Sequence, residues 1–151
     1  MPSARLNTYV PLIRHFAANL IAFHSVVAQR LCLHVTDLKG LRILERGPMT
    51  AGELGEEAGL SGAAVTALID RLEKAGYVFR ERGTGDRRRV TIHVIAEKMT
   101  QVDRHYEGQR VSMSKLLSQY SAKEFSAIAD FLEQTTRVLA NEAKKLEMNQ
   151  D

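Results

Sequence analysis

Apolar residues along the chain follow two different periods, and the change between them separates helical from extended segments. Residues 8–31 repeat apolar side chains every three to four positions, which predicts a long amphipathic helix. The same period predicts further helices over residues 36–45, 50–58, 61–74, 96–119 and 121–146. Residues 77–82 and 89–95 are rich in β-branched and aromatic side chains, and glycines lie between them, which predicts a β-hairpin. We therefore expect a mainly α fold with a small β-hairpin.

The middle third of the chain has the signals of two short helices joined by a tight turn. Met49 can start a short strand, and Thr50 with Glu53 forms a capping box for the first helix. Gly59 suits the positive φ of a sharp turn, and Ser61 can cap the second helix. Followed by the hairpin, this is the outline of a winged helix-turn-helix, a module that reads DNA.

The second of these helices has two different sides. Four apolar residues are expected to point inward: Val65, Leu68, Ile69 and Leu72. Gly55 in the first helix allows close approach, and the β-branched Val65 can lock the pair. The other side of the second helix carries mostly small side chains over its first two turns, which suits insertion into a groove. Those turns contain no Arg, Asn or Gln, so bidentate reading of guanine or adenine is not expected from them.

Capping residues also predict where the flanking helices begin. Thr36 is a candidate N-cap, with Asp37 in the first turn favoured by the helix dipole. Ser121 and Glu124 form a capping box for the last helix. Long helices with broad apolar stripes at both ends of the chain are expected to pack together across a two-fold axis, as in a homodimer.

The positive charge of the chain is concentrated in residues 70–89. This window holds seven basic and four acidic residues, which accounts for the whole net charge of +3. The basic residues are Arg71, Lys74, Arg80, Arg82, Arg87, Arg88 and Arg89. Such a cluster favours a polyanion partner, and the alternative is a solvated charged face.

Composition and residue spacing argue against several other classes of protein. A single cysteine, Cys32, excludes an intramolecular disulfide framework and fits a reducing cytoplasm. We expect Cys32 to be a small buried residue. No apolar run approaches the roughly 18–20 residues of a membrane span, and no signal sequence is evident. No catalytic triad, paired-carboxylate site, phosphate loop or metal-ligand spacing is found, so we expect neither an enzyme nor a cofactor. His24 lies on the apolar stripe of the first helix and is expected in the core or an interface.

Short motifs in the central third resemble those of the multiple antibiotic resistance regulator (MarR) family of bacterial transcription factors. The matching motifs are Gly59-Leu60-Ser61, Val65-Thr66, Ile69-Asp70-Arg71-Leu72-Glu73, Gly76-Tyr77-Val78 and Asp86-Arg87-Arg88. The chain departs from the family in having Ile95-Ala96 where Leu-Thr is usual, which removes a threonine N-cap. It also has Gly55 where alanine is commoner.

The resemblance implies a homodimer bound to double-stranded DNA. Residues 1–34 and 120–151 would form the dimerisation region, residues 35–95 the winged helix-turn-helix, and residues 96–119 a long connecting helix. One helix of each subunit would enter a major groove of a pseudo-palindromic operator, with wing arginines over the flanking minor grooves. The residues expected at the DNA are Thr50, Ser61, Ala63, Ala64, Thr66, Ala67, Asp70, Arg71, Arg82, Asp86, Arg87, Arg88 and Arg89. Among these, Asp86 would hold the wing by pairing with Arg88.

The function that these signals favour is a cytoplasmic, dimeric transcription repressor, released from DNA by a small anionic or aromatic ligand. As the resemblance implies, that ligand would bind between the dimerisation helices and the winged helix, and Arg14 and His24 are candidate contacts. One alternative is a redox regulator that acts through oxidation of Cys32. Another is a winged helix that serves as a protein-interaction scaffold and has no DNA target.

Overall fold

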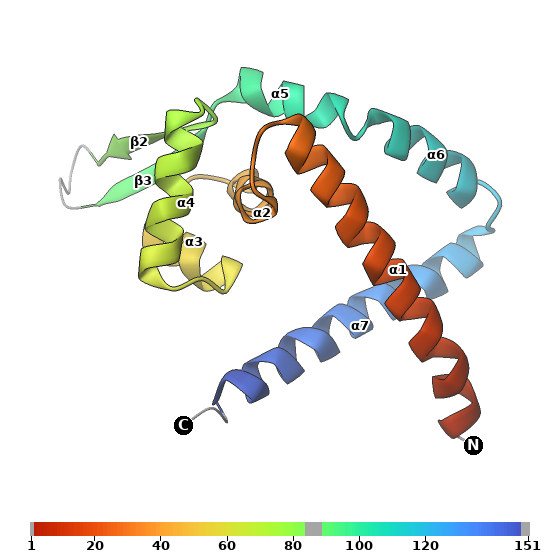
Figure 1. The fold of residues 1–151 in the computed structure, drawn as a ribbon. Helices are drawn as coiled ribbons and strands as arrows, with labels where there is room; N and C mark the ends of the chain where they lie inside the picture. Colours follow the sequence, from red (N-terminus) through yellow and green to blue (C-terminus); the bar gives the residue numbers. More distant parts are fainter. Residues whose placement is uncertain (1, 84–88, 149–151) are drawn as a thin grey trace. The chain divides into compact units, whose positions relative to one another are not determined.

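The computed structural model describes residues 2–83 and 89–148, which divide into two units (Figure 1). The first unit extends to His105, and the second begins at Tyr106. The elements of the first are α1 (Pro2–Arg30), α2 (Val35–Leu44), β1 (Met49–Thr50), α3 (Ala51–Ala58), α4 (Gly62–Lys74), β2 (Val78–Arg82), β3 (Val90–Val94) and α5 (Ala96–Arg104). The second contains α6 (Glu107–Leu117) and α7 (Ala122–Met148). This confirms a mainly α winged helix-turn-helix fold.

The small sheet has three antiparallel strands in the order β1-β3-β2. In the hairpin, Val78 is opposite Val94 and Arg82 is opposite Val90. The short strand β1 pairs with β3, so that Met49 is opposite Ile92. The predicted hairpin and short strand are therefore confirmed, and each hairpin strand begins one residue later than the sequence pattern indicated.

Helices α2, α3 and α4 share one apolar core with the inner face of the sheet. Its fully buried side chains include Leu41, Leu44, Leu54, Leu68, Ile69, Leu72, Val78 and Ile92. Close helix approach depends on two glycines. A Cβ at Gly55 would lie 3.3 Å from both the Leu60 carbonyl oxygen and Val65 Cγ1, and one at Gly40 would lie 3.0 Å from Leu68 Cδ2. The predicted contact between Gly55 and Val65 is confirmed.

The caps of the helix-turn-helix are those that the sequence predicted. The Thr50 N–H donates to Glu53 Oε2 at 2.6 Å, and the Glu53 N–H donates to Thr50 Oγ1 at 3.3 Å. The Ala64 N–H donates to Ser61 Oγ at 3.4 Å. Gly59 ends α3 with a φ of 66°, the left-handed conformation that a residue without Cβ adopts without strain. These local bonds fix the turn between α3 and α4.

The predicted N-cap of α2 is wrong by two residues. The helix begins at Val35, and His34 is the N-cap in place of Thr36. The reason is that Asp37 occupies the third helical position and accepts a hydrogen bond from the His34 N–H at 3.2 Å. A carboxylate at that position reaches back to the residue three before it, and that residue becomes the cap.

The single helix predicted over residues 96–119 is also wrong, because α5 ends at Arg104 and α6 begins at Glu107. At the break the His105 N–H bonds to the Val102 carbonyl three residues back, at 3.1 Å, which tightens the last turn of α5. Gly108 in the first turn of α6 weakens helix continuation. As the departure at Ile95 suggested, α5 begins without a side-chain cap.

Helix α1 ends in a Schellman motif that places Cys32 in the left-handed conformation, with a φ of 54°. The Cys32 N–H donates to the Gln29 carbonyl at 3.2 Å, and the Leu33 N–H donates to the Ala28 carbonyl at 2.9 Å. The prediction that Cys32 is buried is wrong: its position just beyond the helix end leaves it exposed.

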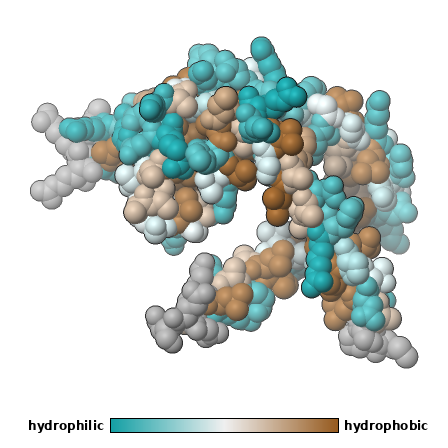
Figure 2. Space-filling model, viewed as in Figure 1, coloured by the Kyte–Doolittle hydropathy of each residue, from teal (hydrophilic) through white to brown (hydrophobic). Residues whose placement is uncertain are grey.

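Most apolar residues of the long terminal helices are exposed (Figure 2). In α1 they include Leu12, Phe16 and Ile21, and no described residue of the second unit is buried. By length and composition alone, α1 holds one segment, residues 4–30, that could cross a membrane. One such helix is weak evidence for a membrane span, because core helices of soluble proteins have the same length and composition.

Candidate nucleic-acid interface

The outer side of α4 is slim and uncharged over its first two turns. Ala63, Thr66 and Ala67 are exposed, while Ala64 is half-buried. Thr66 Oγ1 donates to the Gly62 carbonyl at 2.8 Å, so this hydroxyl proton is already used within the helix. Val65, Leu68, Ile69 and Leu72 are buried against the core, which confirms the predicted inward side.

Arg71 extends from α4 to Asp37, at the start of α2. Its Nη2 lies 2.5 Å from Oδ1 of the carboxylate, and its Nε lies 3.1 Å from Oδ2. The Asp37 side chain is 1% exposed, whereas that of Arg71 is 40% exposed. The pKa of Arg71 is raised, chiefly because the guanidinium donates hydrogen bonds to Asp37, and burial opposes this effect. This ion pair ties α4 to α2.

Arg80 of β2 forms a second link to α4, on the side of the hairpin. Its Nη2 lies 2.5 Å from Oδ1 of Asp70, and its Nη1 bonds to the Glu73 carboxylate. The pKa of Arg80 is raised, first by the hydrogen bond to Asp70 and against the effect of burial. Two of the basic residues counted in the positive cluster therefore have acidic partners within the same unit.

The arginines nearer the tip of the hairpin are more exposed. Arg82 is exposed at the end of β2. Arg89 is also exposed, and its Nη2 lies 3.9 Å from Oε1 of Glu53, which belongs to the capping box of α3. The predicted pair of Asp86 with Arg88, and Arg87 between them, lie outside the described residues. Arg82 and Arg89 therefore place exposed positive charge toward the end of the hairpin.

The outer face of the hairpin has a cluster that the sequence did not reveal. The rings of Phe79 and His93 stack at 5.1 Å between centroids, and these residues are opposite each other in the register. His93 Nε2 lies 3.2 Å from Glu81 Oε2 and 3.0 Å from Thr91 Oγ1. Alternation along the strands places these four side chains on the face opposite Arg80 and Ile92. These contacts join β2 to β3 on one face of the hairpin that carries Arg82.

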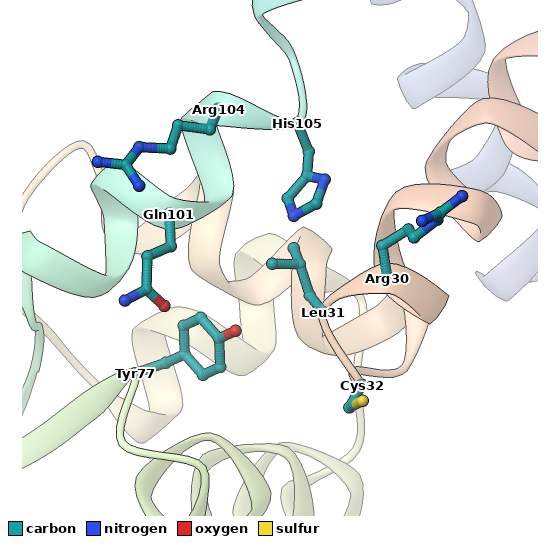
Figure 3. Close-up of a pocket in the computed structure, with 7 residues that line it drawn as sticks. All are labelled: Arg30, Leu31, Cys32, Tyr77, Gln101, Arg104 and His105. Carbon is teal, nitrogen blue, oxygen red and sulfur yellow. The ribbon is translucent and has the colours of Figure 1, made fainter.

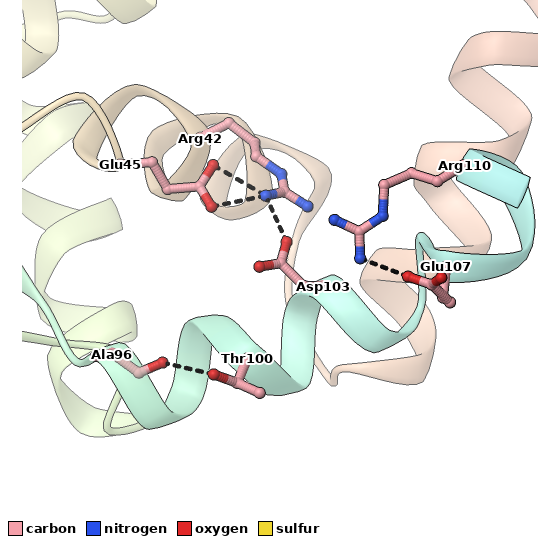
Figure 4. Close-up of polar contacts among 7 residues, drawn as sticks. All are labelled: Arg42, Glu45, Ala96, Thr100, Asp103, Glu107 and Arg110. Atoms are coloured by element: carbon pink, nitrogen blue, oxygen red, sulfur yellow. Dashed lines mark hydrogen bonds and ion pairs between the residues drawn. The ribbon is translucent and has the colours of Figure 1, made fainter. Parts of the chain in front are cut away.

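Arg42 links α2 to α5 (Figure 4). Its Nη1 donates to Glu45 Oε1 at 2.7 Å and to Asp103 Oδ1 at 3.1 Å. Within α5, Thr100 Oγ1 donates to the Ala96 carbonyl at 3.2 Å. Since Met99 and Val102 of α5 are buried, apolar and polar contacts together hold α5 on the winged helix.

A cavity of about 490 Å³ lies where the end of α1, the start of β2 and the end of α5 meet (Figure 3). Its lining residues are Arg30, Leu31, Cys32, Tyr77, Gln101, Arg104 and His105. In Figure 3 the Tyr77 hydroxyl and the His105 ring both point toward Leu31. The pKa of Tyr77 is raised, mainly by burial and further by the nearby Cys32 thiol group. The cavity combines aromatic and cationic side chains.

The candidate ligand contacts from the sequence lie elsewhere on α1. Arg14 is exposed, and His24 is half-buried with its ring centroid 6.0 Å from that of Phe23. Neither lines this cavity. Sequence reasoning missed the cavity residues because they come from three separate segments, and no motif joins them. Within the described residues, no group of three or more His, Cys, Asp or Glu side chains could hold a metal ion.

Comparisons with known proteins agree with this geometry. Residues 41–89 match the MarR family. The chain is 41% identical over 140 residues to YcgE of Bacillus subtilis, an uncharacterized HTH-type transcriptional regulator. The matched region covers 92% of this chain and 91% of that protein.

Two solved structures show the same fold. A MarR family protein from Bacillus stearothermophilus has a TM-score of 0.75 and 23% identity, covering 93% of this chain and 99% of that one. A mutant of MepR from S. aureus, bound to an oligodeoxyribonucleotide, has a TM-score of 0.61 and 19% identity. That match covers 87% of this chain and 97% of the MepR chain. The matched family and these relatives are regulators of transcription and not enzymes. By its sequence and its fold, the chain belongs to the MarR family of DNA-binding transcription regulators.

Proposed function

We propose that the protein is a cytoplasmic, homodimeric repressor that binds a pseudo-palindromic operator and leaves it when a small ligand binds. The observation that carries the proposal is the slim, exposed side of α4 beside a hairpin whose exposed arginines lie toward its tip. The similar S. aureus MepR mutant is bound to an oligodeoxyribonucleotide, which supports DNA as the partner. Repression would follow from occupancy alone, because a dimer on its operator excludes other proteins from the same DNA.

In this proposal α4 enters the major groove and the hairpin lies over the backbone. Exposed Ala63, Thr66 and Ala67 would contact base edges, including thymine methyl groups. Ser61 and Thr50 at the helix N-termini would lie near phosphates, and Asp70 would face the groove beside its partner Arg80. The hairpin arginines would supply the sequence-independent part of the affinity, which depends on salt.

The exposed apolar residues of the terminal helices support a homodimer. Large apolar side chains line α1, α6 and α7, and such a surface in water is unfavourable by about 25 cal/mol per Å². A second copy of the chain would cover it and would hold two α4 helices at a fixed spacing. That spacing is what a pseudo-palindrome requires.

The cavity at the end of α1 is the site that we propose for the ligand. Arg30, Arg104 and His105 favour a negatively charged group, and Tyr77 offers an aromatic surface. A small aromatic carboxylate has both properties. Because the cavity walls come from α1, α5 and the start of the hairpin, a ligand there would change how the hairpin is held.

A second candidate is redox regulation through Cys32, and its exposure in the structure favours it. Oxidation of this thiol beside Tyr77 would alter the same cavity wall. In that case peroxide treatment releases DNA, and the variant Cys32→Ser abolishes the release. Release that persists in Cys32→Ser would exclude the thiol as the sensor.

The test of the main proposal is selection of bound duplexes from genomic fragments, followed by binding measurements at two salt concentrations. We expect a selected pseudo-palindrome, and binding that weakens steeply with salt. The variant Arg88→Ala is expected to weaken binding to all duplexes and to reduce the salt slope by about 1. Absence of any salt-dependent binding to DNA would instead support a protein-interaction scaffold.

A further inference from the structure

The role of Arg71 follows from its partner more than from its exposure. With 40% of its side chain exposed on α4, it could reach a phosphate, and the family resemblance places it among the residues expected at the DNA. A forked phosphate contact through Nε and Nη2 and a positioning role make opposite demands on these two nitrogens. The first needs them free for DNA, and the second needs them held by the protein.

The geometry shows that two of the three guanidinium nitrogens already bond to the protein. Nε and Nη2 of Arg71 form a fork on both oxygens of Asp37, at 3.1 Å and 2.5 Å. The same carboxylate accepts the His34 N–H at 3.2 Å, at the end of the segment that joins α1 to α2. Two forked bonds fix the direction of the guanidinium, and through it the rotation of α4, which a single contact with a point charge would not do.

Burial decides which partner holds the arginine. The Asp37 side chain is 1% exposed, so a guanidinium that moved to a phosphate would leave a buried anion without its counter-charge. A phosphate on the DNA surface remains in contact with water and salt, where its attraction is screened. The competition therefore favours Asp37.

We propose that Arg71 is a positioning residue that orients α4 through Asp37 and does not contact phosphate. This rests on the proposed function, because orientation matters only if α4 reads DNA. The segment between α1 and α2 also contains Leu31 and Cys32, which line the cavity at the end of α1. The ion pair thus joins α4 to an element that forms one wall of the proposed ligand site.

The experiment compares a selected duplex with a random duplex across a range of salt concentrations. Arg71→Gln, Arg71→Lys and Asp37→Asn are each expected to weaken binding to the selected duplex by about tenfold, roughly the effect of one mismatched base pair. Affinity for the random duplex and the salt slope are expected to stay unchanged. Lysine keeps the charge but lacks the fork, so it does not rescue binding. Combining Arg71→Gln with Asp37→Asn is expected to be no worse than either change alone.

A phosphate contact gives the opposite pattern. Arg71→Gln would then weaken binding to both duplexes and reduce the salt slope by about 1, Arg71→Lys would restore binding, and Asp37→Asn would strengthen it by freeing the arginine. Those results would overturn the positioning role. Arg82→Gln is the matched control for a phosphate contact, because this arginine lies exposed on the hairpin. Wild-type protein that binds neither duplex would overturn the proposed function itself.

Thermal unfolding shows whether each variant is folded. If the single changes prevent folding, Asp37→Leu combined with Arg71→Met removes both charges together and leaves no unpaired buried ion. This double variant is expected to lose discrimination between the duplexes while it keeps the wild-type salt slope. Full discrimination in the folded double variant would overturn the proposal.

Discussion

The winged helix-turn-helix buries its apolar side chains, whereas the terminal helices expose most of theirs. Leu41, Leu54 and Leu68 are 0% exposed, whereas Leu12 of α1 and Leu139 of α7 are 65% and 60% exposed. Both regions follow the same helical period. In one the apolar side meets other helices of its own unit, and in the other it is exposed. Periodicity therefore predicts which side of a helix is apolar but not which molecule covers it.

The largest expected effect comes from the core of the winged helix. Leu68→Ala should lower the free energy of unfolding by about 2–5 kcal/mol, because it leaves a cavity between α2 and α4. Chemical denaturation over a range of protein concentrations measures this. The matched change Leu12→Ala in α1 should instead act through association, with a loss of stability that varies with protein concentration. Equal concentration dependence for the two variants would contradict the contrast drawn between the regions.

The terminal helices are tested next by placing a charge on their apolar side. Leu132→Glu in α7, at a position that is 48% exposed, should weaken dimerisation by about 30-fold or more, as expected for an interface hot spot. Sedimentation at several concentrations gives the dissociation constant. A wild-type protein that sediments as a monomer throughout would remove the need for a dimer.

A smaller effect separates two glycines in the same helix, α3. Gly52→Ala should stabilise the protein by about 0.5–1 kcal/mol, because alanine favours a helix. A Cβ at Gly52 meets only Thr50 Oγ1, at 4.0 Å. Gly55→Ala should stabilise the protein less than Gly52→Ala or should destabilise it, because the new Cβ lies 3.3 Å from the Leu60 carbonyl oxygen. Thermal unfolding of both variants checks the order, and a more stable Gly55→Ala protein would show that α3 and α4 can separate without cost.

The smallest effect is a pH dependence that the two regions share. Capping holds the pKa values of Glu53 and Glu124 below their ordinary value of 4.5, in each case through bonds from the cap residue, Thr50 or Ser121. Because these pKa values are lowered by folding, the stabilisation is present above 4.5 and is lost as pH falls through the folded value. Glu53→Gln and Glu124→Gln should each flatten the stability curve below that pH. Unchanged curves would mean that the caps contribute nothing through charge.

Local signals were sufficient for much of this structure. The Thr50 capping box, the Gly59 turn and the Ser61 cap each involve residues no more than three positions apart, and all are present as predicted. The failure at Thr36 is instructive, because Asp37 selected His34 as the cap through a bond that was equally local. Either Thr36 or His34 could cap α2, and the preference of threonine for N-cap positions did not decide between them.

The contacts that the sequence could not supply depend on packing. Arg71 and Asp37 are 34 residues apart, and only the crossing of α4 over α2 brings them together. The sequence places Arg80 in the positive cluster, whereas the structure pairs it with Asp70 and Glu73. The cavity likewise has no sequence signature, because three separated segments form it.

The left-handed Cys32 has a practical consequence for following this protein in solution. It is the sole cysteine of the chain, and it is exposed on the cavity wall. One fluorophore or spin probe per subunit could therefore be attached without removing any other thiol. In a two-fold assembly the pair of probes would report a single inter-subunit distance. A change of that distance when an operator duplex or an aromatic acid is added would report the proposed response of the regulator.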